Sequence, residues 1–325
     1  MALAVRDLNA EAARTGGPRF VVREPGPEVR TAVSVAAFFR DDSTVVGVVG
    51  PTDSQGVLDA ASVYGDVEHD GARGLVAVSP TATSPVLSGL SPWFFRVCPD
   101  DAAASRAAAR YAFDSLGARR AAIAYGTHVF GRGWSRAFAD AFVARGGTVV
   151  MREPVSRRVA GWAAPYAAYA ARGRADLLVV AGWTAEALPL VRAAHDRGLE
   201  LPVLGGDALS DVRDPAARAA FAGARYTAFF VADRPPTERG RRFVATYTAA
   251  YGAPPSHQVA LAYDAALLVG RAARAVGADR RAVRDYLAGI GSARGALEGA
   301  TGPIAFDARH DVVDKPVVMA RVGAG

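Results

Sequence analysis

The sequence predicts an α/β protein of about two domains, and two observations support that prediction. Helical stretches alternate with short apolar runs along nearly the whole chain, and these runs are continuously apolar rather than alternating in polarity. Such runs are typical of parallel strands that helices cover on both faces. The chain also has 325 residues, about twice the size of an ordinary domain, so we expect two domains with sizeable cores.

Each expected element rests on the same pattern. The expected helices carry apolar residues at helical spacing and lie at residues 2–13, 29–39, 56–65, 101–116, 133–145, 160–172, 184–197, 237–251, 257–276 and 280–289. The expected strands are the short apolar runs between them, at residues 20–22, 45–49, 75–78, 121–125, 148–150, 177–180, 203–204 and 228–231. Residues 302–307 and 317–322 read as two further strands after the last helix.

Composition excludes several classes of protein. No run of about 18 apolar residues exists, so we expect no membrane helix. Arginine and lysine number 38 against 32 acidic residues, but the basic residues are scattered and interleaved with acids, which argues against a nucleic-acid partner. The single cysteine, Cys98, and five histidines without metal spacing predict no disulfide framework, no metal site and no cofactor. Lys315 is the only lysine in the chain.

Enzyme motifs are also missing from the sequence. No G-x-G-x-x-G follows an expected strand, because the stretch from Gly289 to Ser292 follows a helix. No phosphate-binding P-loop and no G-x-S-x-G nucleophile elbow occur either. We therefore expect a binding protein rather than an enzyme.

Ligands of open α/β sheets bind beyond the carboxyl ends of the strands, so the residues after each strand are the candidates. Ser54 begins a helix after the strand at 45–49, where free N–H groups and a hydroxyl suit a carboxylate. Thr81 and Thr83 follow the strand at 75–78 in a loop flanked by prolines and could bind the same group. An ordinary helix cap, supplied by Ser54 or Asp53, and an ordinary Ser/Thr-rich turn at the threonines remain alternatives.

Two later strand ends carry groups suited to an ammonium. Trp183 follows the strand at 177–180, and Asp207 follows the strand at 203–204. An aromatic face and a carboxylate can together cover and neutralise a cation. A core tryptophan and a helix-capping aspartate are the alternative interpretations.

Seven motifs, in order, resemble those of one family. They are the stretch from Ala4 to Ala10, Val48-Val-Gly-Pro51 with Ser54, Ser79-Pro-Thr-Ala-Thr-Ser-Pro85, Phe94-Phe-Arg96, Phe130-Gly-Arg-Gly133, Ala262-Tyr-Asp-Ala265 and Thr301-Gly-Pro-Ile-Ala-Phe-Asp307. The chain resembles the branched-chain amino-acid-binding proteins (the leucine/isoleucine/valine-binding family), which are type I periplasmic solute-binding proteins of ABC transporters. The resemblance covers essentially the whole chain.

The resemblance implies two Rossmann-like lobes with parallel sheets, joined by three crossovers around a ligand cleft. The first lobe would hold residues 1–98 and 233–310, and the second residues 99–232 and 311–325. By the same resemblance, Ser54, Thr81 and Thr83 bind an α-carboxylate, Asp207 pairs with the α-ammonium, and Trp183 contacts the ligand. Phe130 stands where the family often has tyrosine, so it offers an apolar wall without a hydroxyl.

The resemblance also implies a function and a location. We expect an extracytoplasmic solute-binding protein that captures an amino acid of branched-chain type, or a similar small carboxylate, and passes it to an ABC transporter permease. A ligand-sensing domain of the same fold in a signalling protein is the alternative. The family's first strand would precede Met1 and no signal peptide is recognisable, so we expect a chain that starts downstream of the family's usual start.

Overall fold

The computed structural model describes residues 1–155, 159, 161–210, 212 and 214–323, and structure is given for these alone. They form two compact units: unit 1 holds Met1–Pro99 and Phe229–Pro316, and unit 2 holds Asp100–Ala228 and Val317–Gly325. The breaks expected from sequence lie after residues 98, 232 and 310, and the assignment of these segments to functional lobes stays a prediction. Residues 324–325 lie outside the described part.

Unit 1 is built on a small parallel sheet of three strands in the order β1-β2-β3. These strands are β1 (Val48–Val49), β2 (Ala77–Ser79) and β3 (Phe94–Arg96). The helices of the unit are α1 (Ala2–Thr15), α2 (Ala32–Asp41), α3 (Ser54–Tyr64), α9 (Glu238–Tyr251), α10 (His257–Val276) and α11 (Arg280–Ala288). An antiparallel pair, β9 (Leu297–Gly299) and β10 (Gly302–Ile304), completes it.

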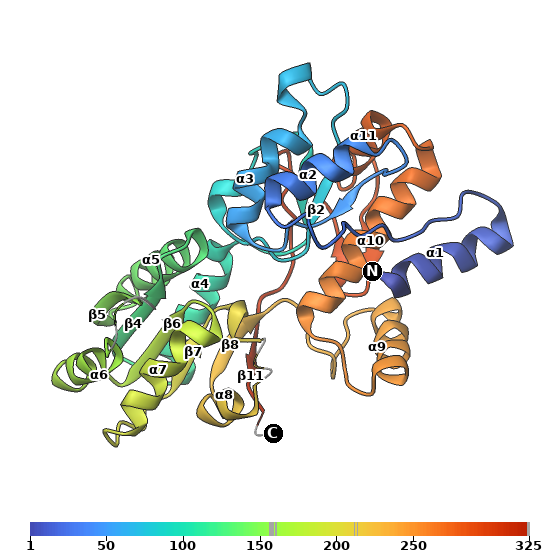
Figure 1. Cartoon of the computed structure of the whole chain (residues 1–325). Coiled ribbons are helices and arrows are strands. Elements are labelled where there is room, and N and C mark those ends of the chain that lie inside the picture. The colour runs from blue at the N-terminus through green and yellow to red at the C-terminus, as the bar shows by residue number, and fades with distance from the viewer. Residues whose placement is uncertain (156–158, 160, 211, 213, 324–325) are drawn as a thin grey trace. The chain divides into compact units, whose positions relative to one another are not determined.

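Helices cover both faces of this sheet because successive strand residues point to opposite sides. Leu75 and Ala77 pack with side chains of α2 and α3 in one buried cluster. On the other face, Val76 and Val269 of α10 converge on Gly47, where a β-carbon would lie within 3 Å of both. α10 also packs against α1 and α11 and is buried along most of its length; Figure 1 shows it beside both.

Unit 2 is built on a six-stranded sheet in the order β11-β8-β7-β6-β4-β5, parallel except for β11, which runs antiparallel to β8. Its strands are β4 (Arg120–Gly126), β5 (Thr148–Val155), β6 (Leu177–Ala181), β7 (Val203–Gly205), β8 (Arg225–Ala228) and β11 (Val318–Arg321). Its helices are α4 (Asp101–Arg110), α5 (Val129–Val143), α6 (Ala163–Arg172), α7 (Thr184–His195) and α8 (Pro215–Ala220).

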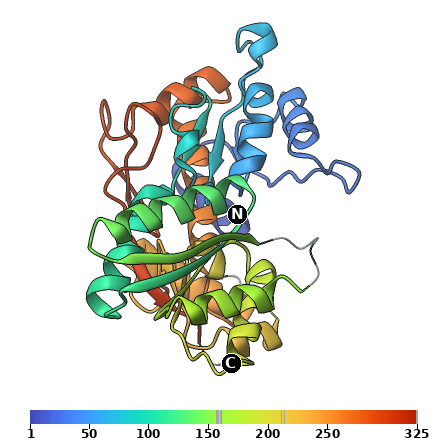
Figure 2. The same ribbon diagram turned by 90° about the vertical axis from the view of Figure 1, so that its left-hand side faces the viewer.

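These helices lie in two layers. α4 and α5 pack on one face of the sheet, and α6, α7 and α8 share a buried cluster with the other face. Figures 1 and 2 show the two layers on either side of the strands. The sequence therefore predicted the α/β class and the parallel core correctly.

Some expected elements differ from the structure. The expected strand at residues 20–22 is irregular chain. Its Phe20 is tied to α1, because the Asn9 side-chain amide donates to the Phe20 carbonyl and accepts from its N–H, each at 2.8 Å. The last parallel strand is β8 rather than residues 228–231, and β3, β9 and α8 were missed. Ala160, the expected start of one helix, lies outside the described residues.

A buried ion pair lies inside unit 1. The Lys315 ammonium lies 4.0 Å from the Asp264 carboxylate, and both side chains are buried. Asp264 also accepts hydrogen bonds from the backbone N–H groups of Ala300 and Thr301, so it holds the turn between β9 and β10. Burial raises the pKa of Asp264 and lowers that of Lys315.

Among the helices that the structure describes, none is long and apolar enough to span a bilayer.

Candidate functional site

In unit 1, the two expected carboxylate-binding loops follow neighbouring parallel strands, so both leave the same edge of the sheet. Ser54 is the first residue of α3, after β1, and its buried Oγ accepts a hydrogen bond from the Ser84 N–H at 3.2 Å. Thr83, next to Ser84, is also buried. The structure therefore brings Ser54 and the Thr83 loop together.

The structure shows which side chain caps α3 and where the Thr81 hydroxyl donates. Asp53, not Ser54, caps α3, and its carboxylate accepts from the Gly56 N–H at 2.9 Å. The Thr81 hydroxyl donates to the Thr52 carbonyl at 2.6 Å. Ser54 is therefore not needed as the cap, and the Thr81 hydroxyl links the two loops through its hydrogen bond to Thr52.

Arg96 supports this loop from beneath. Its fully buried guanidinium donates to the Ser84 carbonyl at 2.9 Å and to Ser88 Oγ at 2.8 Å. It also donates to Asp311 at 2.6 Å. The planar fork of arginine suits such a divergent set of acceptors, so Arg96 links the Ser84 backbone to the Ser88 side chain across the 3₁₀ turn η2 (Pro85–Leu87).

In unit 2, three aromatic rings stack at the carboxyl ends of β4 and β6. Phe130 lies in the first turn of α5, and Trp183 precedes α7; their ring centroids are 5.8 Å apart. The His128 ring stacks on both, at 5.9 Å from Phe130 and 5.2 Å from Trp183. Trp183 is 43% exposed while Phe130 is buried. The cluster therefore presents an aromatic surface at this edge of the sheet.

Asp207 follows β7 at the same edge, since β7, β6 and β4 are consecutive parallel strands. The residue is 5% exposed, and burial raises the pKa of its carboxyl to about 7. The Asp207 and Ala208 backbone N–H groups partly oppose that shift. Within the described residues its buried Oδ1 has no hydrogen-bond partner. A buried carboxylate that has no counter-charge among the described residues favours a cationic ligand.

Gly206 brings Asp207 close to the aromatic cluster. A β-carbon at position 206 would lie 2.9 Å from the Phe130 ring and 3.1 Å from Trp134 Nε1. Only glycine allows the strand end and these rings to approach so closely. The structure thus places Trp183 and Asp207 after the ends of adjacent strands, as the sequence predicted from their positions. Phe130, expected from the resemblance alone, lies in the first turn of α5 beside them. The role of all three in binding stays a prediction.

Sequence analysis missed two residues of this cluster, His128 and Glu186. His128 caps α5 by accepting from the Gly131 N–H at Nδ1, at 3.1 Å, and its Nε2 lies 3.2 Å from Glu186 Oε2. The same Glu186 oxygen accepts from the Trp183 N–H at 3.0 Å. The signal was present, because His128 follows the strand at 121–125 as directly as Trp183 follows its own strand.

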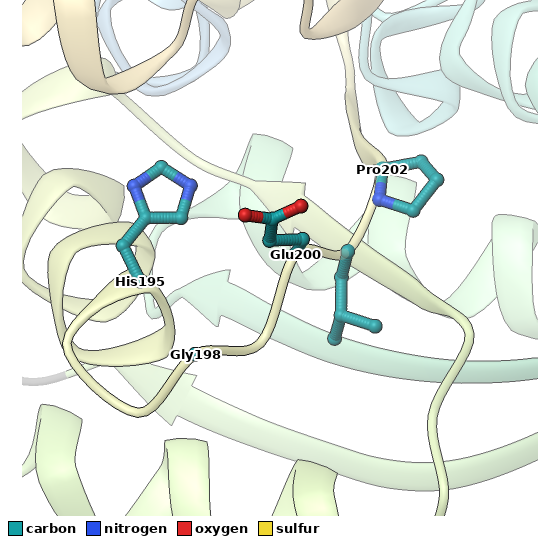
Figure 3. Close-up of a pocket in the computed structure, with 5 residues that line it drawn as sticks. His195, Gly198, Glu200 and Pro202 are labelled. Carbon is teal, nitrogen blue, oxygen red and sulfur yellow. The ribbon is translucent and has the colours of Figure 1, made fainter.

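A cavity of about 460 Å³ lies elsewhere in unit 2. His195, Gly198, Glu200, Leu201 and Pro202 line it, between the end of α7 and the start of β7. Figure 3 shows the His195 ring and the Glu200 carboxylate on its rim. It lies at the amino ends of the strands, opposite Asp207, and so is not part of the candidate site.

No group of three potential metal-ligating side chains occurs among the residues described.

Comparisons with known proteins identify the fold. A substrate-binding protein of an ABC transporter from Desulfitobacterium hafniense, solved in complex with Leu, superposes with a TM-score of 0.82 at 26% identity, covering 98% of this chain and 91% of that one. A branched-chain amino acid transporter substrate-binding protein from Streptococcus pneumoniae, in complex with isoleucine, gives 0.85 at 24% identity, covering 99% and 89%. The expected type I periplasmic-binding-protein fold is therefore confirmed.

Sequence comparisons agree with the structural ones. An amino acid binding protein of Pseudomonas aeruginosa is 28% identical over 207 residues, which are 63% of this chain and 53% of the relative. The chain thus spans about half the length of the curated relative that it matches. A family model described as "Periplasmic binding protein" matches residues 1–325. The chain therefore belongs to the periplasmic binding protein family.

Proposed function

We propose that this protein captures an amino acid of branched-chain type, or a similar small carboxylate, outside the cytoplasm and delivers it to an ABC transporter permease. The observation that carries the amino-acid assignment is the buried Asp207 carboxylate, whose Oδ1 has no partner within the described residues. An α-ammonium would supply the missing charge and a hydrogen bond. The exposed Trp183, at the same edge of the sheet, would contact the ligand side chain.

The loops of unit 1 supply the second half of the proposal. Ser54 and Thr83 offer hydroxyls on neighbouring loops, and Arg96 keeps the second loop in place. Hydroxyls and the N–H groups at the start of α3 suit a carboxylate, and Thr81 closes the loop pair through Thr52. A zwitterion matches the chemistry of both sets of residues, whereas a simple carboxylate matches only the loops of unit 1.

A set of three matched ligands tests this proposal by calorimetry. L-Leucine carries both charges, 4-methylpentanoate lacks the ammonium, and isoamylamine lacks the carboxylate. We expect leucine or another amino acid to bind at least about 30-fold more tightly than either analogue, because removing one partner of a buried charge pair costs about 2 kcal/mol or more. Equal affinities for leucine and 4-methylpentanoate would contradict the role of the ammonium.

Two variants locate the effect. Asp207→Asn is expected to remove most of the advantage of leucine over 4-methylpentanoate, since the neutral amide cannot balance the ammonium. Asp196→Asn, at an exposed position after α7, makes the same substitution away from the site and is expected to leave every affinity unchanged. A thermal-shift screen of the twenty amino acids and small carboxylates would then identify the preferred ligand.

A further inference from the structure

We propose that His128 is the positioning residue of the aromatic surface, holding the exposed Trp183 in place as a neutral ring protonated at Nε2. The role in ligand binding rests on the proposed function, in which Trp183 contacts the ligand, whereas the positioning itself does not. Trp183 needs such support because its indole is 43% exposed, and an exposed side chain at the start of a helix otherwise keeps its rotamer freedom.

His128 holds Trp183 at two points. Its ring stacks on the indole with centroids 5.2 Å apart and an interplanar angle of 26°. Its Nε2 hydrogen bond to Glu186 Oε2 engages the oxygen that also accepts from the Trp183 backbone N–H. Ring and backbone of Trp183 are thus bound to the same His128–Glu186 pair.

The two contacts of the imidazole nitrogens fix its tautomer and its charge. The Gly131 N–H donates to Nδ1, so Nδ1 carries a lone pair and no proton. Glu186 Oε2 is an acceptor for Nε2, so the proton is on Nε2. A doubly protonated ring cannot accept from Gly131, and α5 would lose its cap.

The strand ends leave room for this arrangement. A β-carbon on Gly126, at the end of β4, would lie within 2.8 Å of both the His128 ring and the Glu186 carboxylate. The charged groups on the elements packed here include Glu186 on α7, Asp207 after β7, and Arg132 on α5. Arg132 donates to the Thr127 carbonyl. Among the described residues, Glu186 is the charged group that contacts the ring.

The first test reads Trp183 in the ligand-free protein at pH 8. Acrylamide quenching of tryptophan emission measures how accessible the indoles are to the quencher. Trp183 should be more accessible without the stacked ring, so we expect acrylamide to quench His128→Asn more strongly than the wild type. Adding His128→Asn to Trp183→Phe should bring no such increase, and Asp207→Asn should match the wild type. Equal quenching in His128→Asn and the wild type would overturn the proposal.

The second test measures affinity for L-leucine at pH 8. Asparagine is a good helix cap, so His128→Asn can still cap α5 but provides no ring to stack on Trp183. We expect about a 2- to 10-fold loss of affinity, the size of one aromatic pair, with an unchanged thermal midpoint.

His195→Asn is the matched control for both measurements, because His195 lies in the same unit at the opposite edge of the sheet. It should change neither quenching nor affinity. If leucine does not bind the wild type, the proposed function fails while the quenching test still decides the role of His128. A His128→Asn protein with wild-type affinity and wild-type quenching would refute the positioning role.

Discussion

Replacing Asp207 by asparagine should stabilise the ligand-free protein at neutral and alkaline pH. Burial raises the pKa of this carboxyl from 3.8 to about 7, so the folded state favours the protonated form. The contribution is favourable below pH 3.8 and is lost as pH rises through the folded value. The free energy of unfolding of the wild type should fall, relative to Asp207→Asn, by about 1.4 kcal/mol per pH unit between pH 4 and pH 7. The total loss should be about 4 kcal/mol at pH 8.

Urea unfolding of the wild type and Asp207→Asn at pH 4, 5, 6, 7 and 8 measures this contribution. Three of the four tryptophans, Trp134, Trp162 and Trp183, lie in unit 2 with Asp207, so tryptophan emission follows the relevant unit. Other titrating groups are common to both proteins and cancel in the difference. The difference should be small at pH 4 and grow to a plateau above pH 7. A difference independent of pH would refute the reasoning.

The same carboxylate connects stability to binding. Burial destabilises the ionised form of Asp207 in the empty protein. A ligand ammonium against the carboxylate stabilises that ionised form and so returns its pKa toward ordinary values. Binding an amino acid at pH 6 should therefore release protons. Calorimetry in two buffers with different heats of ionisation measures that release, which Asp207→Asn should lack.

Three further changes test other parts of the molecule. Ser54→Ala should weaken leucine binding about tenfold or more, because a hydrogen bond to a charged group is lost; calorimetry that shows equal affinity would remove Ser54 from the site. Arg96→Gln should lower the free energy of unfolding of unit 1 by about 3 kcal/mol, since Asp311 loses its partner, and Arg96→Lys should lose less. Lys315→Met should cost about 3 kcal/mol in urea unfolding because Asp264 stays buried without its counter-charge, and an unchanged midpoint would contradict this.

The fold was predictable wherever one strand is apolar from end to end. β6 is buried throughout and was found from its sequence almost to the residue. The predicted position of β8 was about three residues too late. Its polar residues, such as Arg225, pair with neighbouring strands, whereas the more apolar Phe229 and Phe230 lie beyond it. The prediction of a strand at residues 20–22 was wrong because this apolar run is not buried in a sheet. Val21 is 86% exposed, and the Phe20 backbone pairs with the Asn9 side chain instead of a neighbouring strand.

The candidate site was predictable in position but not in its hydrogen bonds. Strand ends locate Trp183 and Asp207, because parallel strands bring their carboxyl ends to one edge. Spacing does not reveal that the Thr81 hydroxyl is already donated to Thr52, nor which of Ser54 and Asp53 takes the cap. The hydrogen bonds of Thr81 and Ser54 join segments about thirty residues apart. The position of His128 after an expected strand was a signal, but the hydrogen bonds of its two ring nitrogens arise only in the fold.

Acylation of the Lys315 ε-amine can report the local opening of unit 1. Lys315 is the only lysine in the sequence, and its ε-amine is buried, with a lowered pKa. Acylation of this amine should therefore occur only when unit 1 opens. The rate at which mass spectrometry detects acylated Lys315 would measure that opening directly, without a denaturant.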